Sequence, residues 1–148
     1  MTSRTGAHAI RAMVQLALLS PGEFAGSSRL AEAIGAPQNY LGKLLQTLSR
    51  SGLLESRKGV GGGFRLAGDP ETISLRQILE PIEHLERWEG CFLGLPECSD
   101  DEPCAVHDRW GELRTAYLTF LAETTIASVV ERYRNHPGAR RARGRRSR

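Results

Sequence analysis

The chain has 148 residues, 40% of them hydrophobic, and a formal net charge of +3. This composition can bury a core, which argues against wholesale disorder, and no apolar run approaches the roughly 20 residues of a membrane-spanning helix. The charge is unevenly placed: residues 1–68 sum to +5, residues 69–133 to −9 and residues 134–148 to +7, so only parts of the surface suit a polyanion. Because no secretion signal is read, a cytoplasmic protein is expected.

Two short helices are predicted at the start of the chain. The first runs from about Thr5 to Leu19, where apolar residues recur at helical spacing: Ile10, Met13, Val14, Ala17 and Leu18. The second begins after Ser27 or Ser28, either of which could cap it, and stops at Gly35. Its apolar positions are Leu30, Ala33 and Ile34.

A third helix is predicted between Pro37, which suits a first turn, and Gly52. One face is apolar and carries Leu41, Leu44, Leu45 and Leu48. The opposite face is polar or basic and carries Asn39, Lys43, Gln46 and Arg50. Two helices joined by a short turn, with a polar outer face on the second, indicate a helix-turn-helix.

A basic hairpin is predicted directly after this unit. Residues 53–56 and 64–67 can pair as strands around a glycine-rich loop, with Arg57 and Lys58 at its entrance and Arg65 at its exit. In that position the hairpin is a wing that touches phosphate or the minor groove. A phosphate-cradling nucleotide loop is excluded, because no Gly-Lys-Ser/Thr and no helix follow the glycines.

The second half of the chain is predicted to hold a helix, a loop and two more helices. Asp69-Pro70 starts a linker, Ser74 caps a helix that ends near His84, and residues 88–103 form a polar loop. The acidic residues from Glu80 to Glu102 are expected on solvated surface. A long helix from about Ala105 to Glu123 then presents an apolar stripe made of Trp110, Leu113, Tyr117, Phe120 and Leu121.

That stripe lies beyond the winged helix and needs a partner surface. The same helix of a second subunit is the economical answer, since DNA readers of this type dimerise on two-fold sites, and the alternative is that the helix folds back on its own domain. Thr124 or Thr125 can cap a last short helix, and the basic residues 134–148 have nothing to pack and are expected to be disordered.

Three cysteines lie within fourteen residues: Cys91, Cys98 and Cys104. In a chain without a secretion signal, clustered cysteines favour a metal or redox site over structural disulfides. Thiolates hold iron–sulfur clusters or zinc, and three cysteines with one histidine suit either. His107 stands three residues after Cys104, so both can face one site at the start of a helix. An iron–sulfur cluster is preferred over zinc or a clusterless thiol sensor.

The order of these features resembles the Rrf-type winged-helix transcription regulators with IscR-like iron–sulfur sensing. The matching residues are Tyr40-Leu41, Ser51-Gly52-Leu53-Leu54, the wing from Lys58 to Phe64, and the stretch 104–110 with Cys104, His107 and Trp110 in step. The resemblance covers residues 1 to about 133. It implies a 2Fe–2S cluster if His107 is the fourth ligand. Otherwise 4Fe–4S sensors become the better model, and His8 of the other subunit could contribute.

The expected fold is mainly α with a small β-hairpin wing, a winged helix-turn-helix followed by a long dimerisation helix. Residues 1–68 form the DNA-binding domain, 69–104 the linker helix and cysteine loop, 105–133 the dimerisation helices and 134–148 the basic tail. The expected partners are double-stranded operator DNA and a second copy of the chain.

DNA contacts are expected to divide by type. Gln38, Asn39 and Lys43 can reach base edges in the major groove. Tyr40 either touches phosphate or packs beside Leu44. The wing residues bind phosphate or the minor groove, and these are Arg57, Lys58 and Arg65.

The predicted function is that of a DNA-binding repressor which senses iron–sulfur status, redox or nitric oxide. No Ser/His/Asp or paired-carboxylate arrangement suggests catalysis, so no enzyme is expected. A zinc-binding or clusterless thiol-based winged-helix regulator is the first alternative. A small iron–sulfur electron carrier is the second, although electron transfer requires neither a helix-turn-helix nor a wing.

Overall fold

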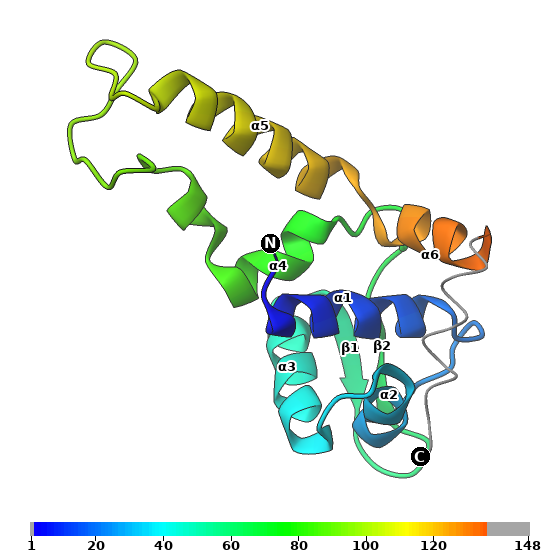
Figure 1. Ribbon diagram of the computed structural model, residues 1–148. Helices are drawn as coiled ribbons and strands as arrows, with labels where there is room; N and C mark the ends of the chain where they lie inside the picture. Colours follow the sequence, from blue (N-terminus) through cyan, green and yellow to red (C-terminus); the bar gives the residue numbers. More distant parts are fainter. Residues whose placement is uncertain (1, 136–148) are drawn as a thin grey trace, which may run out of the picture.

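A computed structural model describes residues 2–135, in which one two-stranded hairpin packs beside the first three helices (Figure 1). Most of the predicted basic tail therefore lies outside the described residues, and the two that are described, at 134 and 135, belong to the last helix. The elements in chain order are α1 (Arg4–Ala17), α2 (Ser27–Ile34), α3 (Gln38–Arg50), β1 (Leu54–Arg57), β2 (Gly63–Leu66), α4 (Leu75–Glu83), the short 3-10 helix η1 (Leu85–Trp88), α5 (His107–Glu123) and α6 (Ile126–Asn135).

The winged-helix body is built from α1, α2, α3 and the hairpin. The leucines predicted for the inner face of α3 are all buried: Leu41, Leu44, Leu45 and Leu48. In α1 and α2 the predicted faces are partly wrong. Leu18 lies past the end of α1 and is exposed, whereas Ala9, Ala12 and Leu16 are buried. In α2 it is Ala31, not Ala33, that packs inward.

Glycines stand at both ends of α2, one as its N-cap and one as its C-cap. Gly35 closes the helix in the left-handed conformation at φ 68°, as predicted, because glycine adopts that conformation without a side-chain clash. At the other end the predicted serine cap is wrong. Gly26 is the N-cap, and Ser27 is already the first helical residue. The turn before α2 instead pairs with the wing, because Ala25 and Phe64 form an antiparallel bridge.

The wing is an antiparallel pair in which Leu54 faces Leu66 and Arg57 faces Gly63. Gly63 has a φ of 126° and lies against the backbone of Ala25 so closely that a Cβ would collide with it. Only glycine fits both conditions. The hairpin is therefore fixed against the helix-turn-helix, and the basic loop at its tip keeps a defined position.

Helix α4 begins in a capping box, in which the Ser74 side chain accepts from Gln77 and the Gln77 side chain accepts from the Ser74 backbone. The helix ends at His84, whose φ of 50° is the only positive value of a non-glycine residue in the described part of the chain. The chain turns there into η1. Glu83, just before this turn, is only 6% exposed, so the expectation that the acidic residues from Glu80 onward are all solvated is wrong at this position.

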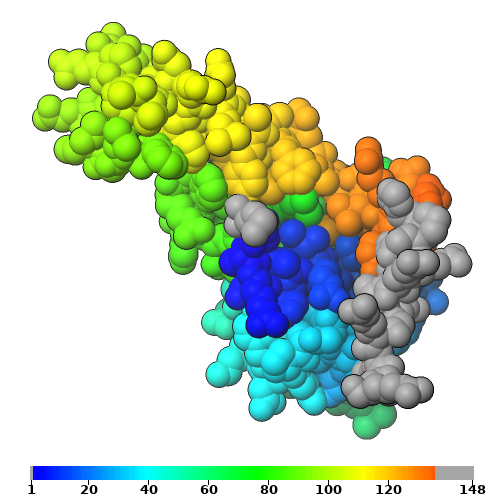
Figure 2. All heavy atoms as spheres, viewed as in Figure 1, coloured from blue at the N-terminus to red at the C-terminus, as the bar shows by residue number. Residues whose placement is uncertain are grey.

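Helix α5 projects from the body together with η1 and the cysteine loop as an arm (Figures 1 and 2). The predicted single apolar stripe is split. Leu121 is buried, and Trp110 and Tyr117 contact Trp88 of η1, whereas Leu113 and Phe120 are more than half exposed. Helix α6 then returns to pack on α1, and the Thr125 hydroxyl caps it by accepting from Ser128 N at 3.2 Å.

Among residues 2–135, none of the helices combines the length and the apolar character that crossing a membrane requires.

Candidate metal centre and DNA interface

The loop between η1 and α5 brings all three cysteines together at the end of the arm. The Sγ atoms of Cys91, Cys98 and Cys104 lie within 4.8 Å of one another, and all three thiols are free and half-buried. The Sγ atoms of Cys91 and Cys104 are 3.7 Å apart. Two thiolates on one tetrahedral metal ion, with bonds of about 2.3 Å, stand roughly 3.8 Å apart. The donor set and its spacing therefore fit a thiolate-bound metal or cluster.

His107, the first residue of α5, lies beside this group. Its Nδ1 is 3.1 Å from the Sγ of Cys98, and its Nε2 is 2.9 Å from Oδ1 of the exposed Asp100. A carboxylate can only accept, so in the neutral ring that suits metal binding Asp100 would take the Nε2 proton and leave the Nδ1 lone pair toward the cysteines. Asp100 was missed in the sequence, where it stood in an acidic run without any feature to separate it from its neighbours.

Backbone hydrogen bonds, burial and neighbouring thiols shift the pKa values of two of the thiols in opposite directions. Hydrogen bonding from Leu95, with a smaller contribution from Leu93, lowers the pKa of Cys91 to about 7. For Cys98, a hydrogen bond from the Cys104 backbone lowers the pKa, but burial and the neighbouring thiols outweigh it and the pKa is raised. The site thus offers one readily formed thiolate beside two other sulfur donors.

Aromatic contacts connect the cysteine loop to the arm that carries it. Trp110 of α5 stacks on Trp88 at 5.7 Å between ring centroids, and Phe92 packs against Trp110 at 5.2 Å. The indole N–H of Trp110 donates to the carbonyl of Gly90 at 2.9 Å. Since Gly90 directly precedes Cys91, this hydrogen bond connects the backbone beside the first cysteine to α5.

The predicted reading face of α3 is exposed and continuous with neighbouring elements. Gln38, Asn39 and Lys43 line a shallow groove, which also contains Ser27 at the start of α2 and Phe64 of the wing. Tyr40 is half-buried, and its ring forms a T-shaped contact with that of His8 from α1, with 5.7 Å between the ring centroids. Burial and the nearby Arg11 and Arg4 lower the pKa of His8.

The two wing arginines are held by a residue that sequence reasoning missed. The guanidinium groups of Arg57 and Arg65 lie 4.3 and 4.7 Å from the ring centroid of Phe24, which precedes α2. Arg65 is also paired with Glu55 at 2.6 Å. Phe24 was a single aromatic residue in a predicted turn, and no periodicity linked it to the wing. Lys58, in the wing loop, is exposed.

Fold and site together define a winged-helix DNA-binding protein with a three-cysteine arm. Comparison with known families places the chain within that class: the model of the Rrf2 family, described as an iron-dependent transcriptional regulator, matches residues 2–132. The chain belongs to the Rrf2 family. It is therefore a transcription regulator and not an enzyme.

Individual relatives agree with this assignment. An HTH-type transcriptional regulator of Aquifex aeolicus is 32% identical over 90% of this chain and 94% of its own length. The regulator IscR of Vibrio vulnificus is 29% identical over 88% of this chain and 76% of its own. Among solved structures, CymR, the global cysteine regulator of B. subtilis, superposes with a TM-score of 0.73 at 24% identity, covering 89% of this chain and 97% of that one. These results confirm the predicted recognition and the mainly α winged-helix fold.

Proposed function

We propose that this regulator is a repressor whose affinity for operator DNA changes with iron–sulfur status, redox conditions or nitric oxide. The sensor is an iron–sulfur cluster bound by Cys91, Cys98, Cys104 and His107. The observation that carries the proposal is the gathering of three thiols within 4.8 Å, with a histidine nitrogen 3.1 Å from one of them. The similarity to an IscR over most of this chain supports it.

The four donors favour a 2Fe–2S over a 4Fe–4S cluster because they fall into two pairs. Cys91 and Cys104 form one pair at 3.7 Å, and Cys98 and His107 form the other at 3.1 Å. A 2Fe–2S cluster needs two protein ligands on each of two irons. When bound, the cluster would supply a centre that oxidants and nitric oxide attack. The chain's own part is to present the thiolates and to hold the His107 ring so that Nδ1 faces the cysteines.

Anaerobic purification with iron, sulfide and visible absorption measurements tests this proposal. We expect a brown or red protein, and we expect Cys91→Ala, Cys98→Ala and Cys104→Ala each to abolish the visible absorption. His107→Ala should give a labile or altered cluster. Full iron and sulfide content in a cysteine variant would remove that residue from the ligand set.

Zinc is the second candidate, because the 3.7 Å separation of Cys91 and Cys104 also fits two thiolates on a single zinc ion. A zinc-stabilised regulator would be colourless and would contain one zinc per chain without sulfide. The same purification therefore separates the two proposals.

For DNA we propose that α3 reads bases while the wing holds phosphate. Gln38, Asn39 and Lys43 are exposed on one face and can reach the major groove. Arg57, Lys58 and Arg65 stand on the wing and can neutralise phosphates. Tyr40 packs against His8 and is half-buried, so its side chain serves the packing of α3 on α1 and remains partly accessible to phosphate.

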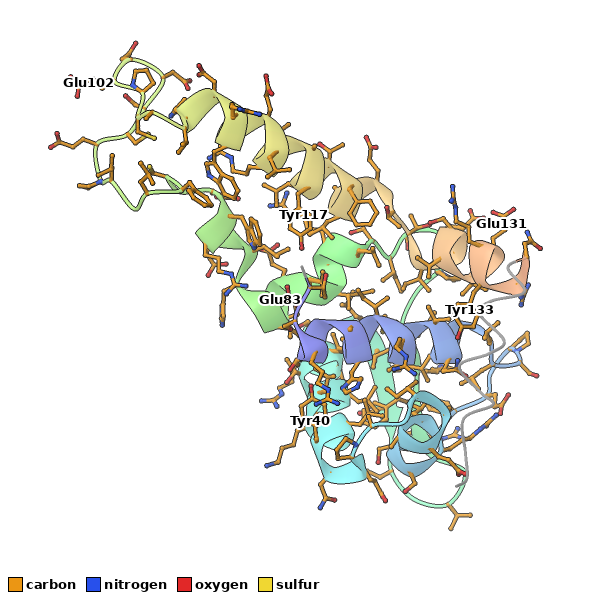
Figure 3. The ribbon with its side chains drawn as sticks, viewed as in Figure 1. Tyr40, Glu83, Glu102, Tyr117, Glu131 and Tyr133 are labelled. Carbon is orange, nitrogen blue, oxygen red and sulfur yellow. The ribbon has the colours of Figure 1, made fainter. Side chains whose placement is uncertain are left out.

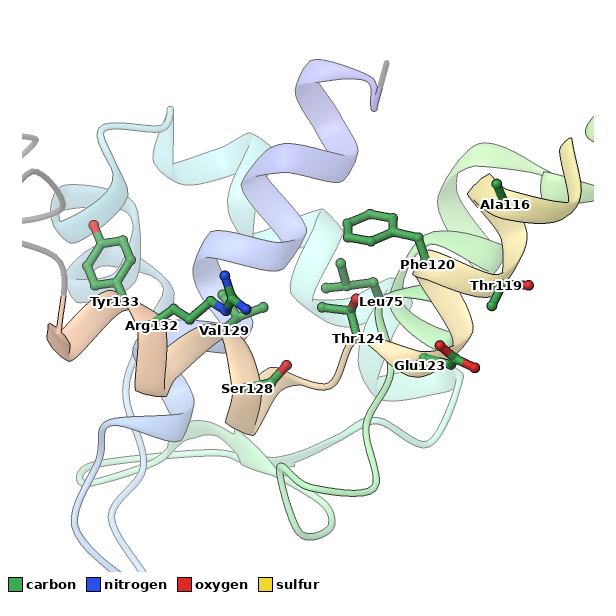
Figure 4. A pocket seen from close by; sticks show the side chains of 10 residues that line it. All are labelled: Leu75, Ala116, Thr119, Phe120, Glu123, Thr124, Ser128, Val129, Arg132 and Tyr133. Atoms are coloured by element: carbon green, nitrogen blue, oxygen red, sulfur yellow. The ribbon is translucent and has the colours of Figure 1, made fainter. Parts of the chain in front are cut away.

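We further propose that a second copy of the chain covers an apolar groove between α5 and α6 (Figure 4). The groove has a volume of 1040 Å³ and is lined by Leu75, Phe120, Val129 and Tyr133. Glu123 and Arg132 also line it, so a two-fold partner could pair these opposite charges. Phe120→Asp should yield monomers in sedimentation, and a variant that remains dimeric would place the interface elsewhere.

Under this proposal the chain divides by task. Residues 1–68 bind DNA, 69–104 link this part to the metal centre and hold its cysteines, and 105–133 join the two subunits. The cysteine loop contacts α5 through Trp110, and α5 packs on α4, which itself packs on α1. Loss of the cluster would loosen the loop and alter the geometry between the two recognition helices.

A further inference from the structure

The three thiols lie within 4.8 Å of one another, but they are not equivalent, because only Cys98 also contacts a histidine nitrogen. The sulfur atoms of Cys91 and Cys104 are in contact at 3.7 Å. The sulfur of Cys98 is instead 3.1 Å from Nδ1 of His107, whose other nitrogen is held by Asp100. If the metal centre is emptied, the 3.7 Å contact between Cys91 and Cys104 and the engagement of Cys98 by His107 favour reaction between the first two sulfurs.

We propose that Cys91 and Cys104 form an intrachain disulfide when the emptied centre meets a peroxide, and that Cys98 remains a thiol. The inference rests on the proposed function only in treating these cysteines as a metal-binding group, and it holds for an iron–sulfur or a zinc protein alike. It gives the regulator a second, reversible redox state in which two of its metal ligands are blocked.

The chemistry is a two-electron oxidation of the thiol pair. The thiolate of one cysteine attacks peroxide, the O–O bond breaks, and the products are a sulfenic acid and, after protonation, water. The thiolate of the other cysteine then attacks the sulfenic sulfur. The S–S bond forms, the S–O bond breaks, and the oxygen leaves as a second water. Two thiols and one peroxide thus give one disulfide and two waters.

Backbone contacts hold both members of this pair at the same end of α5. Cys91 follows Gly90, whose carbonyl accepts from the Trp110 indole at 2.9 Å. The carbonyl of Cys104 accepts from the backbone N–H of His107 at 3.0 Å. Cys98 lies in the middle of the loop, seven residues from one partner and six from the other. The ends of the loop are therefore positioned for bonding, while its middle is engaged by His107.

The experiment uses the full chain, stripped of metal under anaerobic reducing conditions, freed of reductant and exposed to one equivalent of hydrogen peroxide. Cleavage after Glu97 and before Asp100 places the three cysteines on separate peptides, so mass spectrometry can identify the linked pair. We expect the peptides of Cys91 and Cys104 to be joined, Cys98 to remain alkylatable, and dithiothreitol to reverse the bond.

Cysteine variants make the test independent of any single mapping result. Cys98→Ser should form the intrachain bond at the wild-type rate. Cys91→Ser and Cys104→Ser should form one at least roughly tenfold more slowly, because the sulfur pair already in contact is lost. A bond that includes Cys98 in the wild-type chain would overturn the proposal. So would predominant cross-linking between chains, or a Cys98→Ser variant that forms no bond.

Discussion

Glu83 at the end of α4 accepts two hydrogen bonds from Ser3, one from its backbone nitrogen at 2.8 Å and one from its hydroxyl at 2.7 Å. The Ser3 hydroxyl also accepts from Gly6 N and so caps α1. Gly6 leaves the carboxylate its space, since a Cβ there would collide with it. Figure 3 shows Glu83 at the junction of α4 with the start of α1. This carboxylate ties the base of the arm to the DNA-binding body.

Glu83→Ala should therefore lower the free energy of unfolding by roughly 2 kcal/mol, because it leaves the Ser3 donors without their buried charged acceptor. Urea unfolding of the full chain measures the loss. Glu86→Ala is the matched control, since Glu86 is an exposed glutamate three residues further on. Equal stability of the two variants would show that the Ser3 contacts contribute nothing.

A carboxylate on the wing competes with DNA phosphate for one of the wing arginines. Glu55 pairs with Arg65 at 2.6 Å, on the hairpin expected to meet DNA. Glu55→Gln should strengthen binding to random duplex DNA and steepen its salt dependence by about one unit, because Arg65 becomes available to a phosphate. Glu71→Gln, which changes the net charge equally at an exposed linker position, should have a smaller effect. If both variants bind random DNA more tightly by the same factor, the effect comes from the change in net charge and not from the release of Arg65.

Base recognition by α3 and phosphate binding by the wing can be separated by comparing the affinity of variants for operator DNA and for random DNA. Asn39→Ala and Lys43→Ala should each weaken operator binding by about 1–3 kcal/mol and leave random-DNA binding nearly unchanged. Lys58→Ala should weaken both and reduce the salt slope by about one unit. All three side chains are exposed, so folding should be preserved. Titrations at several salt concentrations measure these effects. If Lys58→Ala weakened only operator binding and Asn39→Ala weakened binding to both DNAs equally, the wing and not α3 would recognise the bases.

The faces of α3 and the grouping of the cysteines could be predicted from local sequence patterns, because both depend on residues close together in the chain. The leucine repeat of α3 fixed both its buried face and the outward position of Asn39 and Lys43, because a helix relates such positions by simple rotation. The clustering of Cys91, Cys98 and Cys104 within one loop likewise indicated a common site, which the structure contains.

Contacts between distant segments were not predictable in this way. Glu83 is buried because it meets Ser3, eighty residues earlier, and a single glutamate in an acidic stretch carries no sign of that. Phe24 contacts the wing arginines only because the turn before α2 pairs with β2. Leu18 was assigned to the core because it matched the apolar repeat, yet the helix ends one residue earlier and leaves it exposed.

Two conservative aromatic variants can test whether the hydrogen bond between α5 and the cysteine loop stabilises the bound metal. Trp110→Phe keeps a ring against Trp88 but removes the N–H that binds the Gly90 carbonyl next to Cys91. Tyr117→Phe is the matched control. Its hydroxyl is buried in the same aromatic group and has no hydrogen-bond partner within the described residues. The two variants therefore differ in whether the lost polar group positions the loop.

A neutral hydrogen bond contributes about 1 kcal/mol, which corresponds to roughly a fivefold change in a rate or equilibrium. Trp110→Phe should thus release its metal to a chelator about fivefold faster than the wild type under anaerobic conditions, whereas Tyr117→Phe should release it at the wild-type rate. Iron or zinc in the filtrate can be measured over time, so the result does not depend on which metal is bound. If both variants lose metal at the wild-type rate, the Gly90 contact does not hold the cysteine loop, and other contacts with α5, such as the hydrogen bond from Arg114 to the Glu89 carbonyl at 2.7 Å, must position it.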